Sequence, residues 1–172
     1  YTWELCRGLR ERPDVEDIGF FRYDQWIAEP EICLHARRFK LRPPRWLRRL
    51  TMRSGFHGRL IHGTNYFLPQ RTEMGVLTVH DMSVYRYPEM HPPERIAAFE
   101  RGFMTSLERA AHVITDSHAV RGELIAQTGI SPEKVTTVHL GVSDQFAPFS
   151  MAEREGAVRA LLGKNVADYI LC

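Results

Sequence analysis

The chain has 172 residues, of which 44% are hydrophobic and 26% charged, a composition that fits a globular protein and excludes disordered and collagen-like classes. The net charge is only +2. No run approaches the roughly 20 apolar residues that cross a bilayer and no signal-peptide pattern opens the chain, so we expect a cytoplasmic protein. Cys6, Cys33 and Cys172 are odd in number and far apart, which predicts neither a disulfide framework nor a zinc site.

Strand and helix patterns alternate along the chain. Helix formers and apolar spacings of three and four predict helices over residues 1–12, 92–110, 118–128 and 151–162. Short apolar runs predict strands over residues 18–23, 60–62, 76–79, 112–115, 135–138 and 168–172, with a loop over 85–93. The fold class is therefore α/β, a Rossmann-like parallel sheet flanked by helices. Because such a domain normally opens with a strand and a glycine-rich turn, we expect its first strand to precede Tyr1.

Positive charge is concentrated between Glu31 and Glu73. This segment holds no acidic residue but has ten basic ones: Arg37, Arg38, Lys40, Arg42, Arg45, Arg48, Arg49, Arg53, Arg59 and Arg71. Within it, residues 44–53 predict a short amphipathic helix with Trp46 and Leu50 on its apolar side. Such a helix suits an anionic membrane surface, although the same apolar side chains would also suit docking on the domain itself. No nucleic-acid recognition motif accompanies the charge, so no nucleic-acid partner is expected.

Residues capable of chemistry follow the predicted strands. They are Gly63, Asn65 and Tyr66 after the strand at 60–62, His80, Asp81 and Ser83 after the strand at 76–79, and Ser117 after the strand at 112–115. Ligands of parallel sheets bind beyond the carboxyl ends of the strands, which makes these residues candidates for a site. Local roles compete with this interpretation, because Asp81 suits a turn and Ser117 suits a helix cap beside an anion-repelling Asp116. The eight histidines show no zinc-type spacing with a supporting carboxylate, so no metal site is expected.

Seven short motifs occur in an order that resembles one known family. They are HGTNYFLP (62–69), TVHDMS (78–83), YPxxHP (87–92), SLERA (106–110), ITDS (114–117), PEKV (132–135) and GVxxxFxP (141–148). Together they resemble the N-terminal half of a bacterial retaining GT-B glycosyltransferase of family 4, in particular the mannosyl- and rhamnosyltransferases that build O-antigen and related polysaccharides. Each motif alone is weak, but seven in the right order are specific.

The resemblance implies a two-domain enzyme whose N-terminal domain receives the acceptor and whose C-terminal domain holds the nucleotide-sugar. Residues 1–148 would form the acceptor-side domain without its first strand, and residues 149–172 a linker helix and the first strand of the second domain. The donor-phosphate residues and paired glutamates of the family would lie beyond this chain. We therefore expect residues 1–172 alone to be inactive and prone to aggregation through unpaired strand edges.

The resemblance also implies residue roles. His80 matches the histidine that faces the donor sugar, where its imidazole or its backbone carbonyl would stabilise the positive charge developing on the sugar. Asp81 would orient loops or the acceptor hydroxyl and is not an obvious nucleophile. The candidate substrate-binding residues are Gly63, Asn65, Tyr66, Ser83 and Ser117, and the candidate membrane-binding residues are Arg45, Trp46, Arg48, Arg49 and Arg53.

The expected reaction is transfer of a hexose, with retention, to a growing cell-surface polysaccharide or lipid-linked glycan. The expected donor is a nucleotide-sugar, with GDP-mannose favoured, and no cofactor or metal is expected. The protein would be cytoplasmic and peripheral on the inner face of the plasma membrane. Two alternatives stay open: a non-catalytic sugar- or anion-binding module derived from a transferase half, and an epimerase or phosphorylase with the same fold. The loop at 63–69 and the basic helix speak against the latter.

Overall fold

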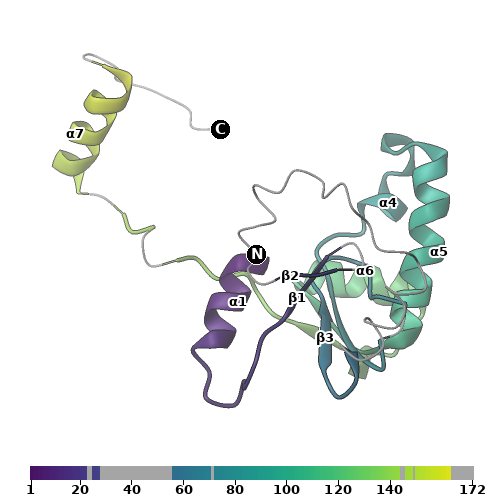
Figure 1. Ribbon diagram of the computed structural model, residues 1–172. Helices are drawn as coiled ribbons and strands as arrows, with labels where there is room; N and C mark the ends of the chain where they lie inside the picture. Colours follow the sequence, from purple (N-terminus) through teal and green to yellow (C-terminus); the bar gives the residue numbers. More distant parts are fainter. Residues whose placement is uncertain (23–24, 28–55, 71, 144–145, 149, 164–172) are drawn as a thin grey trace. The chain divides into compact units, whose positions relative to one another are not determined.

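The computed structural model describes residues 1–22, 25–27, 56–70, 72–143, 146–148 and 150–163 (Figure 1). Two compact units make up the chain, Tyr1–His139 and Leu140–Cys172. The predicted strand at 168–172 and the predicted basic helix at 44–53, with Arg45, Trp46, Arg48, Arg49 and Arg53, lie outside the described residues. The domain boundary expected after residue 148 stays a prediction.

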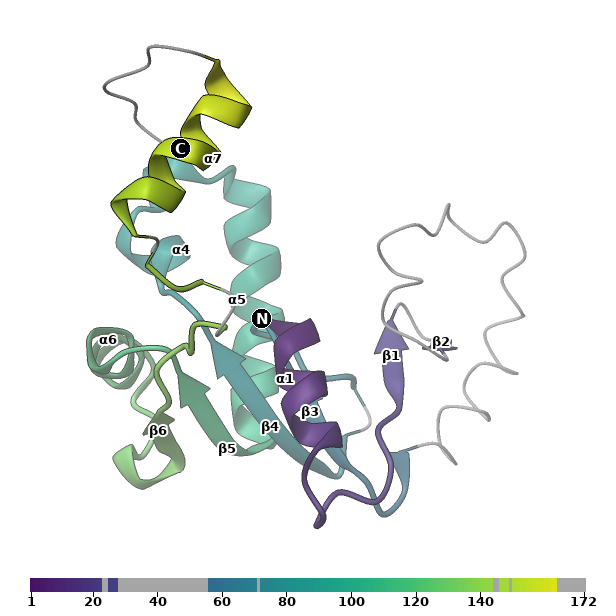
Figure 2. The same cartoon turned by 90° about the vertical axis from the view of Figure 1, so that its left-hand side faces the viewer.

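A parallel sheet of four strands forms the centre of the first unit. The strands are β3 (Leu60–Gly63), β4 (Met74–Val79), β5 (Ala110–Thr115) and β6 (Val135–Thr137), and they lie side by side in that order (Figure 2). The near-continuous apolar composition of β4 fits a strand inside a parallel sheet, since Leu77 and Val79 have no exposed surface. The predicted α/β fold with a parallel sheet is confirmed.

Two helices connect the last three strands and pack on the sheet. They are α5 (Pro93–Arg109), between β4 and β5, and α6 (His118–Thr128), between β5 and β6. Phe103 of α5 and Leu124 of α6 pack in one buried cluster with Leu77, Val79 and Val113 of the strands. Each such side chain contributes roughly 1.5–3 kcal/mol when it is removed from water. The core therefore fixes how the strand ends are placed along the sheet edge.

The segment after β4 is more regular than the predicted loop. It contains a short helix, α4 (Ser83–Arg86), and a 3-10 turn, η1 (Pro88–Met90). Helix α4 begins where Asp81 Oδ1 accepts a hydrogen bond from the Ser83 amide at 2.8 Å. Val84 is buried, so this segment is held by packing that the pattern of polar residues and prolines did not indicate.

The N-terminal part contributes a helix and a second, small sheet. Helix α1 (Thr2–Arg10) confirms the prediction for residues 1–12, and the strand predicted at 18–23 is β1 (Phe20–Arg22). It pairs antiparallel with β2 (Gln25–Ile27), a strand that the sequence did not indicate. The rings of Phe21, Trp26 and Phe56 pack on one another with centroids 5.0–5.6 Å apart, so a residue far along the chain holds this pair of strands.

Local sequence signals set the ends of the later helices. The Ser117 hydroxyl accepts a hydrogen bond from the Val120 amide at the start of α6, and Gly129 ends that helix in the left-handed conformation with φ 69°. In the second unit, helix α7 (Met151–Leu162) begins with a capping box between Ser150 and Glu153. Both helices match their predicted ranges.

Candidate active site

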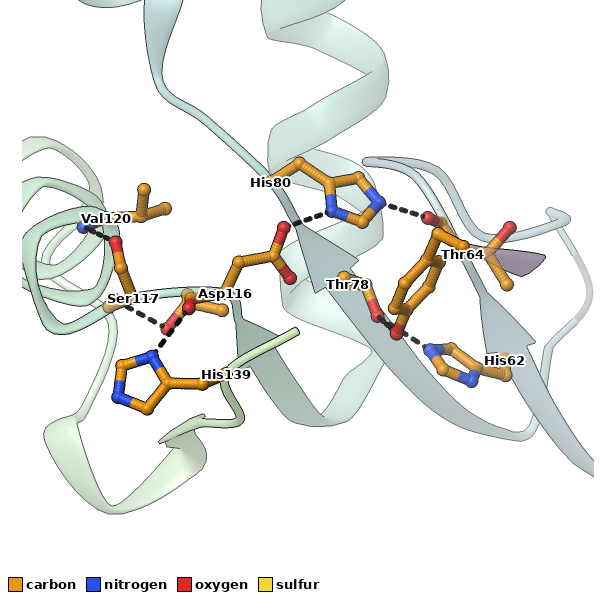
Figure 3. Close-up of polar contacts among 10 residues, drawn as sticks. His62, Thr64, Thr78, His80, Asp116, Ser117, Val120 and His139 are labelled. Atoms are coloured by element: carbon orange, nitrogen blue, oxygen red, sulfur yellow. Dashed lines mark hydrogen bonds and ion pairs between the residues drawn. The ribbon is translucent and has the colours of Figure 1, made fainter. Parts of the chain in front are cut away.

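Polar residues from all four strands meet at the carboxyl edge of the sheet (Figure 3). Thr64 follows β3, His80 follows β4 and Asp116 follows β5. Asp81 comes directly after His80. His139 lies just after β6 and its Nδ1 is 3.1 Å from the backbone carbonyl of Asp116. Because the strands are parallel, residues far apart in sequence share this edge.

His80 is held from both sides of its ring. Nδ1 lies 2.6 Å from Oδ2 of Asp116, and Nε2 lies 2.9 Å from the backbone carbonyl oxygen of Thr64. The Tyr1 ring packs edge-on against the imidazole, with centroids 4.8 Å apart. The His80 side chain is 26% exposed and that of Asp116 is 16% exposed, so the pair lies at the surface of the edge but is largely shielded from water.

Asp81 lies beside His80 and faces a different set of groups. Burial raises the pKa of its carboxyl, but the hydrogen bonds from Ser83 and Tyr66 and the nearby His80 outweigh burial and hold that pKa below its usual value. Burial, followed by the Asp81 carboxylate, raises the pKa of the Tyr66 phenol far above its ordinary value. Asp81 is therefore an ionised turn residue at this edge, and Tyr66 a protonated donor to it.

Tyr66 has an unusual backbone for a residue with a side chain. Its φ is 55°, in the left-handed region that favours glycine. The strain is offset by packing, because its ring contacts Phe99 and Phe103 of α5 at centroid distances of 5.0 and 6.0 Å. The aromatic contacts fix the ring, while the hydroxyl reaches Asp81 at the edge.

Gly63 and Asn65 frame the loop after β3. A Cβ atom on Gly63 would lie 2.4 Å from the Phe67 carbonyl oxygen, so this position admits only glycine without movement of the backbone. Asn65 is exposed, and its carbonyl accepts a hydrogen bond from the Phe67 amide at 2.7 Å. Asn65 directly follows Thr64, whose carbonyl oxygen accepts a hydrogen bond from Nε2 of His80.

A second network lies directly under the edge. Thr78 has no exposed surface, and its hydroxyl lies 2.8 Å from His62 Nε2 and 3.1 Å from the Tyr1 hydroxyl. Burial, and then the nearby His80, lowers the pKa of His62. We infer a neutral imidazole here, which supports β3 and α1 against β4.

The predicted residues fall into two groups by what they contact. His80, Asp81, Tyr66 and the backbone of Ser83 are linked at the edge, whereas the Ser117 hydroxyl is occupied by the Val120 amide as a helix cap. Sequence reasoning did not propose Tyr1, His62, Thr64 and Thr78, and it considered Asp116 only as a charge that repels anions. Thr64 and Asp116 directly follow strands, so the positional rule that selected His80 would have found them.

Two further observations concern other kinds of site. Among the described residues, no three histidine, cysteine or carboxylate side chains gather in a way that would hold a metal ion. In the same part of the chain, no helix combines the length and apolarity needed to cross a membrane.

Fold and site together define a Rossmann-like α/β domain with a polar candidate site at the carboxyl edge of its parallel sheet. The sequence pattern of one family, described as Glycosyltransferase Family 4, matches residues 1–146. The chain belongs to glycosyltransferase family 4, which confirms the resemblance seen in the motifs.

The chain is similar to a characterised relative over most of its own length. The O-antigen chain mannosyltransferase B of Escherichia coli is 31% identical over 136 residues, which cover 79% of this chain and 33% of that protein. The chain thus spans about a third of the length of this relative. No solved structure gives a significant match.

Proposed function

We propose that this chain is the acceptor-side part of a retaining hexosyltransferase. The enzyme would transfer mannose or a related hexose from a nucleotide-sugar, with a GDP-sugar favoured, to a growing cell-surface polysaccharide or lipid-linked glycan. The observation that carries the proposal is the position of His80. In this chain, which belongs to family 4, the His80 ring lies between Asp116 and Thr64 at the carboxyl edge of the sheet. The likeness to an O-antigen chain mannosyltransferase supports the choice of mannose.

In the proposed reaction, the residue at position 80 would stabilise the charge that develops on the sugar and would not transfer a proton. As a sugar leaves its phosphate, positive charge develops on the sugar and negative charge on the leaving group. Both ring nitrogens of His80 already have partners, so neither offers a free lone pair to the sugar. Of the two groups considered for this role, the arrangement favours the backbone carbonyl of His80 over its imidazole.

The loop after β3 and Asp81 supply groups suited to a sugar hydroxyl. Asn65 offers an exposed amide, which can both donate and accept hydrogen bonds. Asp81 is an acceptor at the same edge, and its hydrogen bonds from Tyr66 and Ser83 keep it ionised. These groups would orient the acceptor hydroxyl toward the donor sugar, in keeping with general positioning effects in catalysis.

A donor panel tests this proposal. The full-length protein would be incubated with GDP-, UDP- and dTDP-sugars and a membrane extract as the source of acceptor, and consumption of donor would be measured. We expect one donor to be consumed, and His80→Ala to lower kcat by at least about tenfold because two hydrogen bonds at the site are lost. His57→Ala is the matched control, since the His57 side chain is 82% exposed and lies beside Glu73, on the strand end opposite the site.

A negative result in the donor panel would favour a different function. If a folded full-length protein consumes none of the donors, the transferase proposal fails, and a non-catalytic sugar- or anion-binding module becomes the better hypothesis. Equal rates for wild type and His80→Ala would show that the His80 side chain is not needed at the site, while leaving the transferase proposal intact.

A further inference from the structure

One oxygen of Asp116, the carboxylate that contacts His80, lacks a hydrogen-bond partner in the described structure, which does not favour stability. Oδ2 of Asp116 lies 2.6 Å from the ring, but Oδ1 is buried and has no hydrogen-bond partner within the described structure. A buried carboxylate oxygen without a partner costs free energy, and such groups in native proteins commonly serve function. A neutral asparagine or serine would bury no charge at this position, so the carboxylate of Asp116 lowers the stability of the folded protein here.

The hydrogen-bond roles of the ring follow from its two partners. A backbone carbonyl oxygen only accepts, so Nε2 of His80 carries the proton that faces Thr64. Nδ1 faces a carboxylate oxygen, which also accepts when the carboxyl group is ionised. In that arrangement both ring nitrogens donate, and the positive ring and the negative carboxylate form a pair with no net charge.

The two partners anchor the ring to different strands. Thr64 follows β3, Asp116 follows β5, and His80 itself follows β4, which lies between them. The ring thus spans three neighbouring strand ends. Other polar or titratable groups described around it are Tyr1, which precedes α1, His62 of β3 and Asp81 on its own segment.

We propose that Asp116 is a positioning residue, which locks the His80 ring as a double hydrogen-bond donor and thereby fixes the backbone of residue 80 at the substrate edge. The inference rests on the proposed transferase function for its kinetic consequence, but the state of the ring can be measured independently. Asp116 acts through His80 and needs no contact with substrate. A ring locked in this way cannot serve as a general base, because it has no free nitrogen.

The first test reads the ring directly. In full-length protein labelled with ¹⁵N-histidine, we expect both ring nitrogens of His80 to carry protons, as its two acceptor partners require, with assignment by comparison with His80→Ala. Asp116→Ala should abolish this signature, and a signature that survives in Asp116→Ala would show that Asp116 does not hold the ring in this state. A wild-type His80 ring with one unprotonated nitrogen would overturn the lock.

The second test reads the kinetic consequence. We expect Asp116→Ala to lower kcat roughly 10- to 100-fold, the value of one hydrogen bond to a charged group, with KM for the donor changed little. Asp116→Asn should restore only part of kcat, since its amide oxygen can accept the same Nδ1 proton but supplies no negative charge to pair with a doubly protonated ring. Asp14→Asn is the matched control, because Asp14 is exposed and pairs with Arg12.

The two tests separate the inference from the proposed function. If no donor is consumed, the transferase proposal fails, yet the ring signature still decides whether the lock exists. If a donor is consumed and Asp116→Ala keeps the wild-type kcat, the positioning role is wrong while the transferase proposal stands.

Discussion

Gly63 is the residue at which the backbone requirement of the site is sharpest. Its missing side chain leaves room for the Phe67 carbonyl oxygen, which would otherwise lie 2.4 Å from a Cβ atom, with Leu77 Cδ1 at 3.0 Å. The loop that presents Thr64 and Asn65 therefore depends on close contact between main-chain atoms. The close contact alone explains why residue 63 is a glycine, and no ligand is needed to explain it.

Substitution of Gly63 by alanine should lower the stability of the domain. We expect Gly63→Ala to cost about 1–3 kcal/mol, because the backbone must move to admit the methyl group. The measurement is the midpoint of thermal unfolding. Gly122→Ala is the matched control: a Cβ atom at this position in α6 would have no neighbouring atom within 4 Å, so the same substitution there should raise stability by about 0.5–1 kcal/mol. An unchanged midpoint for Gly63→Ala would contradict the close contact.

His62 gives the first unit a dependence on pH. Because burial and His80 lower its pKa in the folded protein, the unfolded chain binds a proton that the folded one resists. This contribution to stability is complete above the ordinary histidine pKa of about 6.5 and is lost as the pH falls from there toward the lower folded value. Stability should therefore rise with pH through this window.

Replacement of His62 by glutamine tests that sign. Glutamine can keep a hydrogen bond to Thr78 but does not titrate, so the fall in unfolding midpoint between about pH 8 and pH 5 should be smaller in His62→Gln than in wild type. His57→Gln is the control, since its side chain is 82% exposed. An identical pH dependence in His62→Gln and wild type would show that His62 is not the group responsible.

At the scale of elements, α6 shows how a local signal and a candidate site can coincide. Ser117 was a candidate for substrate binding and for a helix cap, and its hydroxyl is 3.2 Å from the Val120 amide that it caps. Asp116 lies immediately before it, so an anion at this helix start would meet a carboxylate. The helix cap accounts for Ser117, and its role in substrate binding stays a prediction.

The two roles of Ser117 differ in what a substitution changes. As a cap, Ser117→Ala should destabilise the protein by about 1 kcal/mol and leave KM and kcat of the transfer reaction unchanged. Ser117→Thr keeps the hydroxyl acceptor and should retain most of the stability. A raised KM for donor or acceptor with an unchanged unfolding midpoint would instead assign Ser117 to substrate.

At the scale of the whole molecule, the uneven charge predicts where the protein meets its surroundings. The segment between Glu31 and Glu73 carries ten basic residues and no acidic one. A lipid-linked acceptor would require the enzyme to approach an anionic membrane surface, and a basic amphipathic segment is suited to that. This remains a proposal about residues 44–53, which lie outside the described structure.

Sedimentation with vesicles tests the membrane proposal. Replacement of Arg45, Arg48, Arg49 and Arg53 by glutamine should weaken binding to vesicles containing anionic lipid by about tenfold or more, since each basic residue near the surface contributes about 1 kcal/mol. The matched control replaces the exposed Arg7, Arg95, Arg101 and Arg154, which gives the same change in net charge. Equal loss of binding in both variants would indicate a general charge effect and would remove the claim for this segment.

Sequence alone determined the features that depend on neighbouring residues. The helices predicted at 92–110 and 118–128, the cap at Ser117 and the apolar run of β4 each depend on residues close together in the sequence, and all were predicted. The family motifs also carried the assignment to glycosyltransferase family 4. His80 was selected because it directly follows a strand of a parallel sheet.

Only the tertiary structure decided what surrounds His80. Its partners Thr64 and Asp116 lie 16 and 36 residues away, and Thr78 meets Tyr1 from 77 residues away. Strand β2 likewise depends on Phe56 packing against Trp26. Such contacts arise because the folded sheet brings residues from distant parts of the chain together, and they leave no periodic pattern in the sequence. The sequence therefore indicated the sheet edge at which a candidate site lies, and the packing of the sheet determined which side chains meet there.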